Sequence, residues 1–211
     1  VLNQNIDEEI TFMPDVEYQQ GLTRYIRAKG HMPLPEQAAT EEQTSALLHV
    51  YRTGRIIYAD FAVFGPFGTR FLRKVRLNGV RLETDGTFRK VEMYGPPTYT
   101  LWLGCYKVFS TISISHDIIS RMNLKKYRIK LRDLLHMFGD DAVTEELWVL
   151  LYQADTRARA ERMNAIRWEM VEEHARSSLQ HKSSAFDPAR PWDAVWARMA
   201  EDSDFWKREF E

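Results

Sequence analysis

The chain has 211 residues, 44% of them hydrophobic, and its formal net charge is −1. A single domain of this length buries roughly 70% of the surface that its unfolded chain exposes, so we expect a self-supporting core. A division into two small domains is the alternative. The near-zero charge excludes a global attraction to nucleic acid or to anionic membranes, and any such contact has to come from a local patch.

The single cysteine, Cys105, excludes an intramolecular disulfide and a zinc site built from several cysteines. It lies in an apolar helical pattern, where a buried and inert thiol is expected. Low cysteine content is typical of a reducing compartment. The longest apolar run is too short and too polar to span a bilayer. We therefore expect an intracellular protein, cytoplasmic or nuclear, with no membrane contact.

Residues 1–39 are acidic and interrupted by prolines, which predicts an N-terminal arm with a short helix at about residues 18–27. The next segment opens with a capping box, in which the Thr40 side chain accepts from the third helical N–H and Gln43 reaches back. A helix is therefore predicted to follow Thr40, and Gly54 can end it.

A small strand region is predicted next. Residues 56–64 are rich in branched and aromatic side chains, which favours a strand. Residues 69–77 fit either a short helix or a strand. Residues 80–94 predict a hairpin, because Asp85 and Gly86 lie between residues 80–82 and residues 88–91 as a tight turn does.

Three helices are predicted to form the centre of the molecule. Thr98 caps the first, Asn123 caps the second, which Gly139 closes, and Thr144 starts the third, which runs to about Arg176. The apolar side chains of the second helix fall within an arc of about 100°, the width of a core-facing stripe. They are Leu124, Tyr127, Leu131, Leu134, Leu135 and Phe138.

The predicted fold class is mainly α within an α+β arrangement. A central helical bundle spans residues 40–176, with a small strand or hairpin insertion at about 56–94. A linker follows at 177–190, and residues 191–211 form a C-terminal docking helix rich in aromatic side chains.

No arrangement of residues predicts chemistry. The six histidines show no metal-binding spacing, and the turn from Gly65 to Gly68 lacks the Lys-Ser/Thr of a phosphate-binding loop. We predict no catalytic, cofactor-binding or metal-binding residues, no cofactor and no small-molecule substrate, and hence no enzyme. An enzyme whose site is assembled from dispersed residues is the alternative.

The second central helix is basic. Four of its cations step by four, three and four residues along one edge of the apolar stripe, and two more lie on the other side. Such a stripe could follow a phosphate backbone. The alternatives are cations that only keep a core helix hydrated, or an acidic protein partner. The candidates for nucleic-acid contact are Arg121, Lys125, Arg128, Arg132, Lys126 and Lys130.

The long third helix carries two apolar stripes. Both must be buried, either within the chain or against a second copy, and the C-terminal aromatics could serve as anchors on a neighbour. Beside one stripe, Asp155 and Arg159 are spaced to pair for a few tenths of a kcal/mol. The candidates for self-association are Trp148, Tyr152, Met163, Ile166, Met170, Trp192, Trp196, Phe205 and Trp206.

Five segments carry a family resemblance. They are Pro33 to Gln43; Asp60 to Phe64; Tyr94 to Pro97 with Trp102 and Tyr106 to Val108; Leu151 to Asp155 with Arg157 and Arg159 to Glu161; and Pro191 to Val195. In this order they resemble an abundant group of dinoflagellate proteins that look like the Gag portion of retroelement polyproteins. The resemblance covers residues 33–211.

The resemblance implies a capsid-like structural domain that self-assembles and packages RNA, with reverse transcriptase and protease encoded elsewhere. The chain lacks the cysteine-rich zinc knuckle that often accompanies Gag, and the predicted hairpin departs from the all-helical capsid fold. We therefore expect the chain to bind itself as a homo-oligomer, with RNA as a second partner. A monomeric nucleic-acid-binding adaptor is the alternative.

Overall fold

A computed structural model of the chain describes residues 12–52, 61–65, 76–82, 88–137, 145–180 and 186–210. The protein is mainly helical, as the sequence predicts. Its helices are α1 (Asp15–Lys29), α2 (Glu41–Arg52), α3 (Tyr99–Ser115), α4 (Arg121–His136), α5 (Glu145–Arg157), α6 (Met163–Leu179), α7 (Trp192–Glu201) and α8 (Ser203–Arg208). Its strands are β1 (Arg76–Leu82) and β2 (Phe88–Tyr94).

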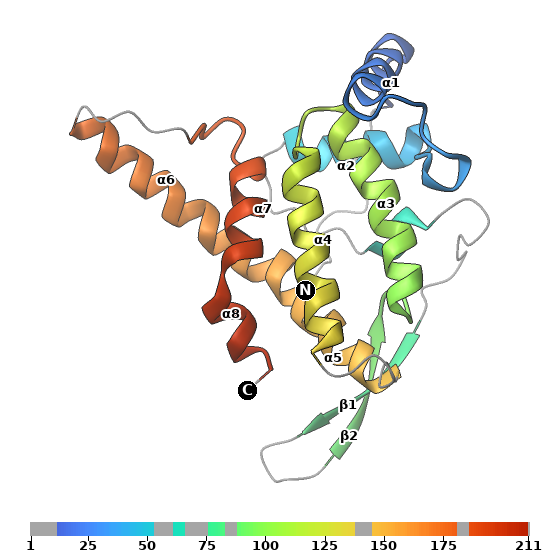
Figure 1. Ribbon diagram of the computed structural model, residues 1–211, viewed down its shortest axis with the longest axis vertical. Coiled ribbons are helices and arrows are strands. Elements are labelled where there is room, and N and C mark those ends of the chain that lie inside the picture. Colours follow the sequence, from blue (N-terminus) through green and yellow to red (C-terminus); the bar gives the residue numbers. More distant parts are fainter. Residues whose placement is uncertain are drawn as a thin grey trace.

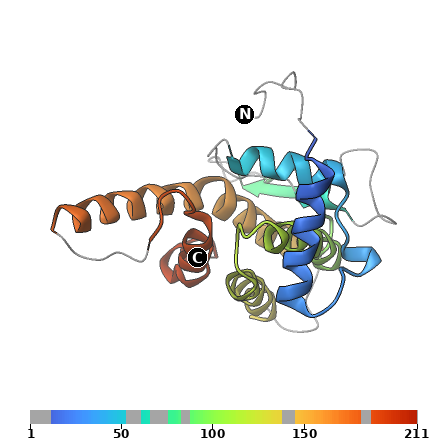
Figure 2. The ribbon, with the colours of Figure 1, turned by 90° about the horizontal axis from the view of Figure 1, so that it is seen from above.

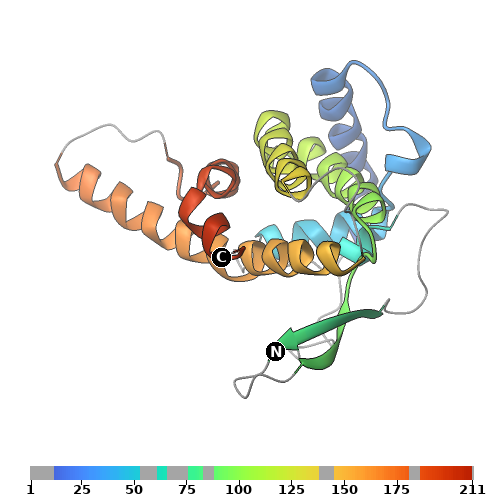
Figure 3. The same cartoon turned by 60° about the horizontal axis from the view of Figure 1, so that its bottom comes forward.

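The helices α3 and α4 run side by side at the centre, and α1 crosses one end of the pair (Figure 1). Together α5 and α6 form a long rod that passes the bundle, and α7 packs against both α4 and α6. Seen from above, α6 projects well beyond the rest of the molecule (Figure 2). The two strands extend from the opposite end to α1 (Figure 3).

The segment predicted as an acidic arm contributes α1, which packs against α3 as part of the helical domain. Tyr25 is 1% exposed, and Arg24 Nε donates to the Ser115 carbonyl at 2.7 Å. Gly21 permits the close approach, because a Cβ at this position would lie 3.0 Å from the His116 ring. Since α1 docks through a glycine and one tyrosine rather than an apolar stripe, its composition concealed the contact.

The capping box at the start of α2 is confirmed. The Gln43 backbone N–H donates to Thr40 Oγ1 at 3.2 Å, and the Thr40 N–H donates to Gln43 Oε1 at 3.0 Å. Leu47 and Leu48 on the inner face of α2 are buried in the core. The predicted end at Gly54 lies outside the described residues.

The strand predicted for residues 56–64 is wrong over its last four residues, which form a 3₁₀ turn, η2 (Phe61–Phe64). Residues three apart lie on the same side of a 3₁₀ turn. Phe61 and Phe64 therefore both reach Phe109, with ring centroids 5.1 and 5.7 Å away. Packing of two aromatic rings onto α3 outweighs the local preference for a strand. Residues 56–60 lie outside the described part.

The strands β1 and β2 pair antiparallel, with a register that runs from Arg76 opposite Tyr94 to Leu82 opposite Phe88. The turn predicted at Asp85 and Gly86 lies outside the described residues, as do residues 69–75 of the ambiguous segment. Gly95 follows β2 with φ +151°, and a Cβ there would lie 2.2 Å from the Tyr152 ring. The chain can turn into α3 at this point only because Gly95 has no side chain.

Thr98 caps α3 as predicted, since its Oγ1 accepts from the Leu101 N–H at 3.2 Å. The predicted cap of α4 is wrong: Ser120 caps it, accepting from the Asn123 N–H at 3.3 Å. Asn123 instead donates to Asp193 Oδ1 at 2.9 Å and so ties α4 to α7. The predicted end at Gly139 lies outside the described residues. The apolar stripe faces the core through Leu124, Tyr127, Leu131, Leu134 and Leu135, which are buried; Phe138 is not described.

The long third helix consists of α5, a π-helical turn (Ala158–Arg162) and α6. Asp155 and Arg159 pair at 2.7 Å across this junction, but the pair is buried and not at the surface. Tyr127 and Trp102 also donate to the Asp155 carboxylate, at 2.8 and 3.1 Å. Burial opposes the charge of Arg159, but the Asp155 carboxylate raises the pKa of Arg159 above its usual value. The pair thus joins α3, α4 and α5 inside the core.

The C-terminal helices dock on their own chain. Trp196 packs against Tyr127 and Phe109, with centroids 4.6 and 5.4 Å apart, and Trp206 Nε1 donates to the Met199 carbonyl at 2.9 Å. Most of the residues proposed for self-association lie in this core. Buried within one copy are Trp148, Tyr152, Met163, Ile166, Trp192, Trp196, Phe205 and Trp206, and Met170 is partly buried against them.

Of the two alternatives given for the stripes, burial within the chain is the one observed, and burial against a second copy is wrong for these residues. The π-helical turn and the fold-back of α7 bring both faces of the α5–α6 rod against the same core. These nine side chains therefore pack within the single copy, and eight of them are too deeply buried to contact a second one.

Candidate functional site

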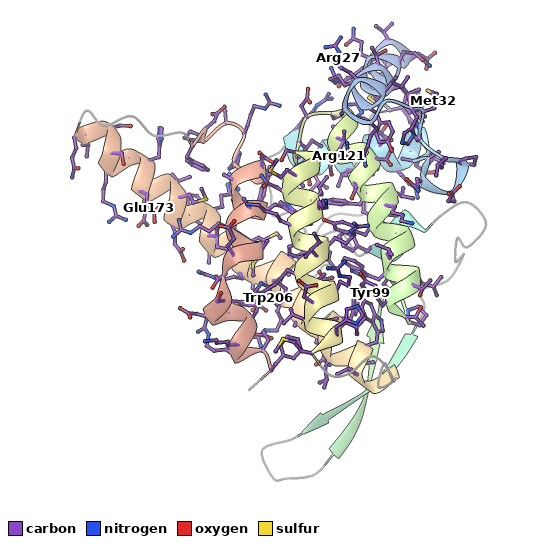
Figure 4. The ribbon with its side chains drawn as sticks, in the orientation of Figure 1. Arg27, Met32, Tyr99, Arg121, Glu173 and Trp206 are labelled. Carbon is purple, nitrogen blue, oxygen red and sulfur yellow. The ribbon has the colours of Figure 1, made fainter. Side chains whose placement is uncertain are left out.

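A groove of about 320 Å³ lies between α1, α3 and α4. Lys29 comes from the end of α1, Lys107 from the middle of α3, and Arg121, Lys125 and Arg128 from the first two turns of α4. In Figure 4, Arg121 lies at the end of α4 that is next to α1. Tyr25, Gln37, Tyr106, Ser110, Thr111, Ile114 and Leu124 line the rest of the groove.

The walls of the groove are fixed by hydrogen bonds between the helices. The Tyr106 hydroxyl donates to the Leu124 carbonyl at 2.9 Å, which holds α3 against α4. Arg121 Nη1 donates to the Ala28 carbonyl at 3.4 Å, near the C-terminus of α1. Tyr25 and Tyr106 of the lining are buried, and Lys29 Nζ lies 6.0 Å from the centroid of the Tyr25 ring.

The groove is strongly positive. Its described lining contains five cations and no acidic residue, and none of the five forms an ion pair with another described residue. Burial lowers the pKa of Lys29 below its usual value, and the charges of Arg121 and Arg128 lower it further. The groove also lies at the N-terminal end of α4, where the helix dipole is positive. A bound anion would relieve the repulsion between these charges.

A second cavity also contains several arginines, but its lining includes carboxylates as well. It has about 350 Å³ and is lined by Arg24, Arg52 and Arg190 together with Glu17 and Asp117. Here the cations already have partners: Arg52 pairs with Glu17, Arg24 lies 3.8 Å from Asp117, and Arg190 donates to the Asp117 carbonyl at 2.6 Å. The arginines of this cavity therefore already have partners, whereas the groove arginines form no ion pair with a described residue.

The structure divides the six predicted nucleic-acid contacts. Arg121, Lys125 and Arg128 line the groove. Lys126 turns the other way and pairs with Glu201 of α7 at 2.8 Å. Arg132 pairs with its neighbour Asp133 at 2.9 Å, and Lys130 is partly buried away from the lining. Only three of the six thus belong to the described site.

Lys29 and Lys107 are not among the contacts predicted from the sequence. They lie on two helices other than α4, and only the packing of α1 and α3 brings them to the basic stripe of α4. No spacing within a single helix could have indicated them. The signal that could have helped is the absence of acids from the groove face of α3, since Lys107 is the only charged residue in that helix.

In the described part of the chain, no group of three or more histidines, cysteines or carboxylates lies close enough to hold a metal ion. None of the described helices combines the length and the hydropathy needed to cross a membrane. Comparisons of the chain with known protein families, with curated proteins and with solved structures found no match. Functional conclusions therefore depend on the groove and on the exposed faces of the helices.

Proposed function

We propose that this chain is a structural, Gag-like domain that contacts RNA through the groove between α1, α3 and α4. The observation that supports this most is the set of five cations without described ion-pair partners around one cavity. Unpaired lysines and arginines gathered from three helices cost the fold some repulsion, which phosphate would offset. The resemblance to Gag-like proteins favours RNA as the source of that phosphate.

The size of the groove favours a single strand. A volume of about 320 Å³ fits a short stretch of sugar and phosphate, but it is too small for a duplex. The five cations of the groove bind phosphate whatever the base sequence, so we expect binding with little sequence preference.

The proposal is tested by removing charge from the groove. With Lys107→Gln/Arg128→Gln, we expect the affinity for a single-stranded RNA to fall about 25-fold in roughly 0.1 M salt, since each neutralised phosphate contributes about a factor of five there. Fluorescence anisotropy measures this. The matched control is Lys207→Gln/Arg208→Gln, which removes the same charge from exposed positions on α8. Equal losses for the two variants would reject the groove as the contact.

Self-association is the second part of the Gag-like proposal. The support for it is the exposed apolar face on the projecting α6, where Trp168 is 56% exposed. We expect light scattering to give a molar mass above the 24.8 kDa of one chain at high concentration. A strict monomer that still binds RNA would favour the nucleic-acid-binding adaptor instead.

A further inference from the structure

The rod formed by α5 and α6 has a third apolar face. Toward α7, α6 presents Met163, Ile166 and Met170, which are buried or partly buried. On a helix of 3.6 residues per turn, Trp168 and Leu179 point to the opposite side, and they are 56% and 82% exposed. Glu173 marks the part of α6 that projects away from the bundle (Figure 4). An exposed tryptophan on a projecting helix is a feature that the fold of one chain does not require.

The residues around Trp168 follow a heptad spacing. Ala165, Trp168, Glu172, Ala175 and Leu179 are three, four, three and four residues apart, and all five are exposed. This is the alternation that places side chains along one seam between two paired helices.

We propose that this seam binds the α6 seam of a second copy, with the two helices antiparallel. In that arrangement Trp168 lies opposite Ala175 of the second copy, and Leu179 lies opposite its Ala165. Each large side chain then meets a small one, and both pairs occur twice about the two-fold axis. A parallel pairing would instead place tryptophan on tryptophan and alanine on alanine, which leaves one layer crowded and the next one open.

Charge opposes the antiparallel arrangement at its centre and supports it on either side. Glu172 lies at the centre, where the two carboxylates of the pair approach each other. Arg176 stands 3.8 Å from Glu172 of its own helix and would flank the carboxylate of the second copy as well. Beside the seam, Arg176 lies opposite Glu169 of the second copy, which already accepts from Arg162 at 2.6 Å. The central carboxylates weaken the pair without preventing it, so assembly is reversible.

The interface is small. The seam from Ala165 to Leu179 covers about 21 Å of helix, at roughly 1.5 Å per residue. One such helix pair buries less than the roughly 1,200 Å² of a standard stable interface, which indicates a weak contact that needs high local concentration or additional copies. This inference rests on the self-association part of the proposed function, and it names the surface and the partner.

Sedimentation equilibrium over a wide concentration range tests the seam. We expect the wild-type chain to dimerise, Trp168→Ala to weaken the dimer at least tenfold, and Glu172→Leu to strengthen it about tenfold. Met122→Ala is the matched control, since Met122 is 69% exposed on α4 and should leave the association unchanged. Unaltered association of Trp168→Ala, in a wild-type chain that does dimerise, would overturn the seam alone. A wild-type chain that stays monomeric throughout would overturn the self-association proposal as well.

Cysteine cross-linking tests the direction of the helices. Under mild oxidation, Leu179→Cys alone should give little disulfide dimer, because the two positions are at opposite ends of an antiparallel pair. A mixture of Leu179→Cys and Ala165→Cys chains should cross-link efficiently, and the buried Cys105 should stay inert. Efficient cross-linking of Leu179→Cys with itself would overturn the antiparallel arrangement.

Discussion

The buried Asp155 carboxylate makes the core dependent on one charge. Its Oδ2 accepts from Arg159 Nη2 at 2.7 Å, and both side chains are about 1% exposed. Asp155→Asn keeps the shape but leaves the guanidinium without its counter-ion in the core. We expect the free energy of unfolding to fall by about 3–5 kcal/mol, as it does when one partner of a buried pair is removed. Urea denaturation measures the loss.

Asp155→Leu/Arg159→Met is the control for this prediction, since it removes both charges and keeps apolar volume. It should be closer to the wild type in stability than Asp155→Asn, because no charge is left unpaired. An Asp155→Asn chain that unfolds at the wild-type urea concentration would show that the pair is not buried as described.

Position 95 does not tolerate a side chain. Gly95→Ala would place a Cβ 2.2 Å from the Tyr152 ring at φ +151°, so Tyr152 or the backbone has to move. We expect a loss of about 2–4 kcal/mol in thermal or urea unfolding. Gly30→Ala is a matched comparison, since Gly30 has φ +80° but nothing within 4 Å of the added Cβ. A loss as small as the roughly 1–2 kcal/mol expected for Gly30→Ala would contradict the close contact.

For single residues, the sequence can indicate which side chains pair, but not whether the pair is buried or exposed. The i,i+4 spacing of Asp155 and Arg159 predicts that they pair, yet it is equally consistent with an exposed helix face. Their burial depends on Trp102 and Tyr127 from two other helices. Lys29 and Lys107 were missed for the same reason, because contacts between helices are not encoded in the spacing of any one of them.

Among the elements, the docking of α1 on α3 is expected to depend on pH. Burial lowers the pKa of His116 to about 4, and the charge of Arg24 adds to this, with Arg52 acting in the same sense and Glu17 and Asp117 against it. The unfolded chain, with a usual pKa near 6.5, then binds more protons than the folded one between about pH 4 and 6.5. The contribution of neutral His116 to the free energy of unfolding is therefore fully present above pH 6.5, and it is lost as the pH falls toward 4.

Unfolding in urea at pH 7 and pH 5 measures this effect. His116→Gln should lose less stability between the two values than the wild type, because the titrating group facing α1 is gone. Carboxylates titrate in both proteins and cancel in the comparison. Equal losses in the two proteins would show that His116 is not held neutral against α1.

Element boundaries were predictable where local hydrogen bonds set them. The caps at Thr40 and Thr98 use side chains adjacent in sequence, and both are present. Prediction failed where tertiary packing intervened: Phe61 and Phe64 turn toward Phe109, and Asn123 is recruited by Asp193 of α7. The docking of α1 on α3 is a third case, since a glycine in the sequence does not indicate that another helix packs against it.

For the whole molecule, one chain buries both apolar stripes that had suggested assembly, because α7 and α8 fold back on the rod. The two proposed surfaces lie apart: the groove is beside α1, and the seam is on the face of α6 turned away from α7. A second copy bound to the seam would thus leave the groove open. We therefore expect substitutions in the groove to weaken RNA binding alone and substitutions in the seam to weaken self-association alone. Each property can then be measured in a chain that has lost the other.

The salt dependence of RNA binding tests the central claim most directly. If all five groove cations neutralise phosphates, the logarithm of the association constant should fall with the logarithm of salt concentration with a slope of about −3.5, at roughly 0.7 per phosphate on a single strand. Lys107→Gln/Arg128→Gln should reduce the magnitude of the slope by about 1.4. A wild-type slope near zero, or an unchanged slope in the double variant, would contradict the account.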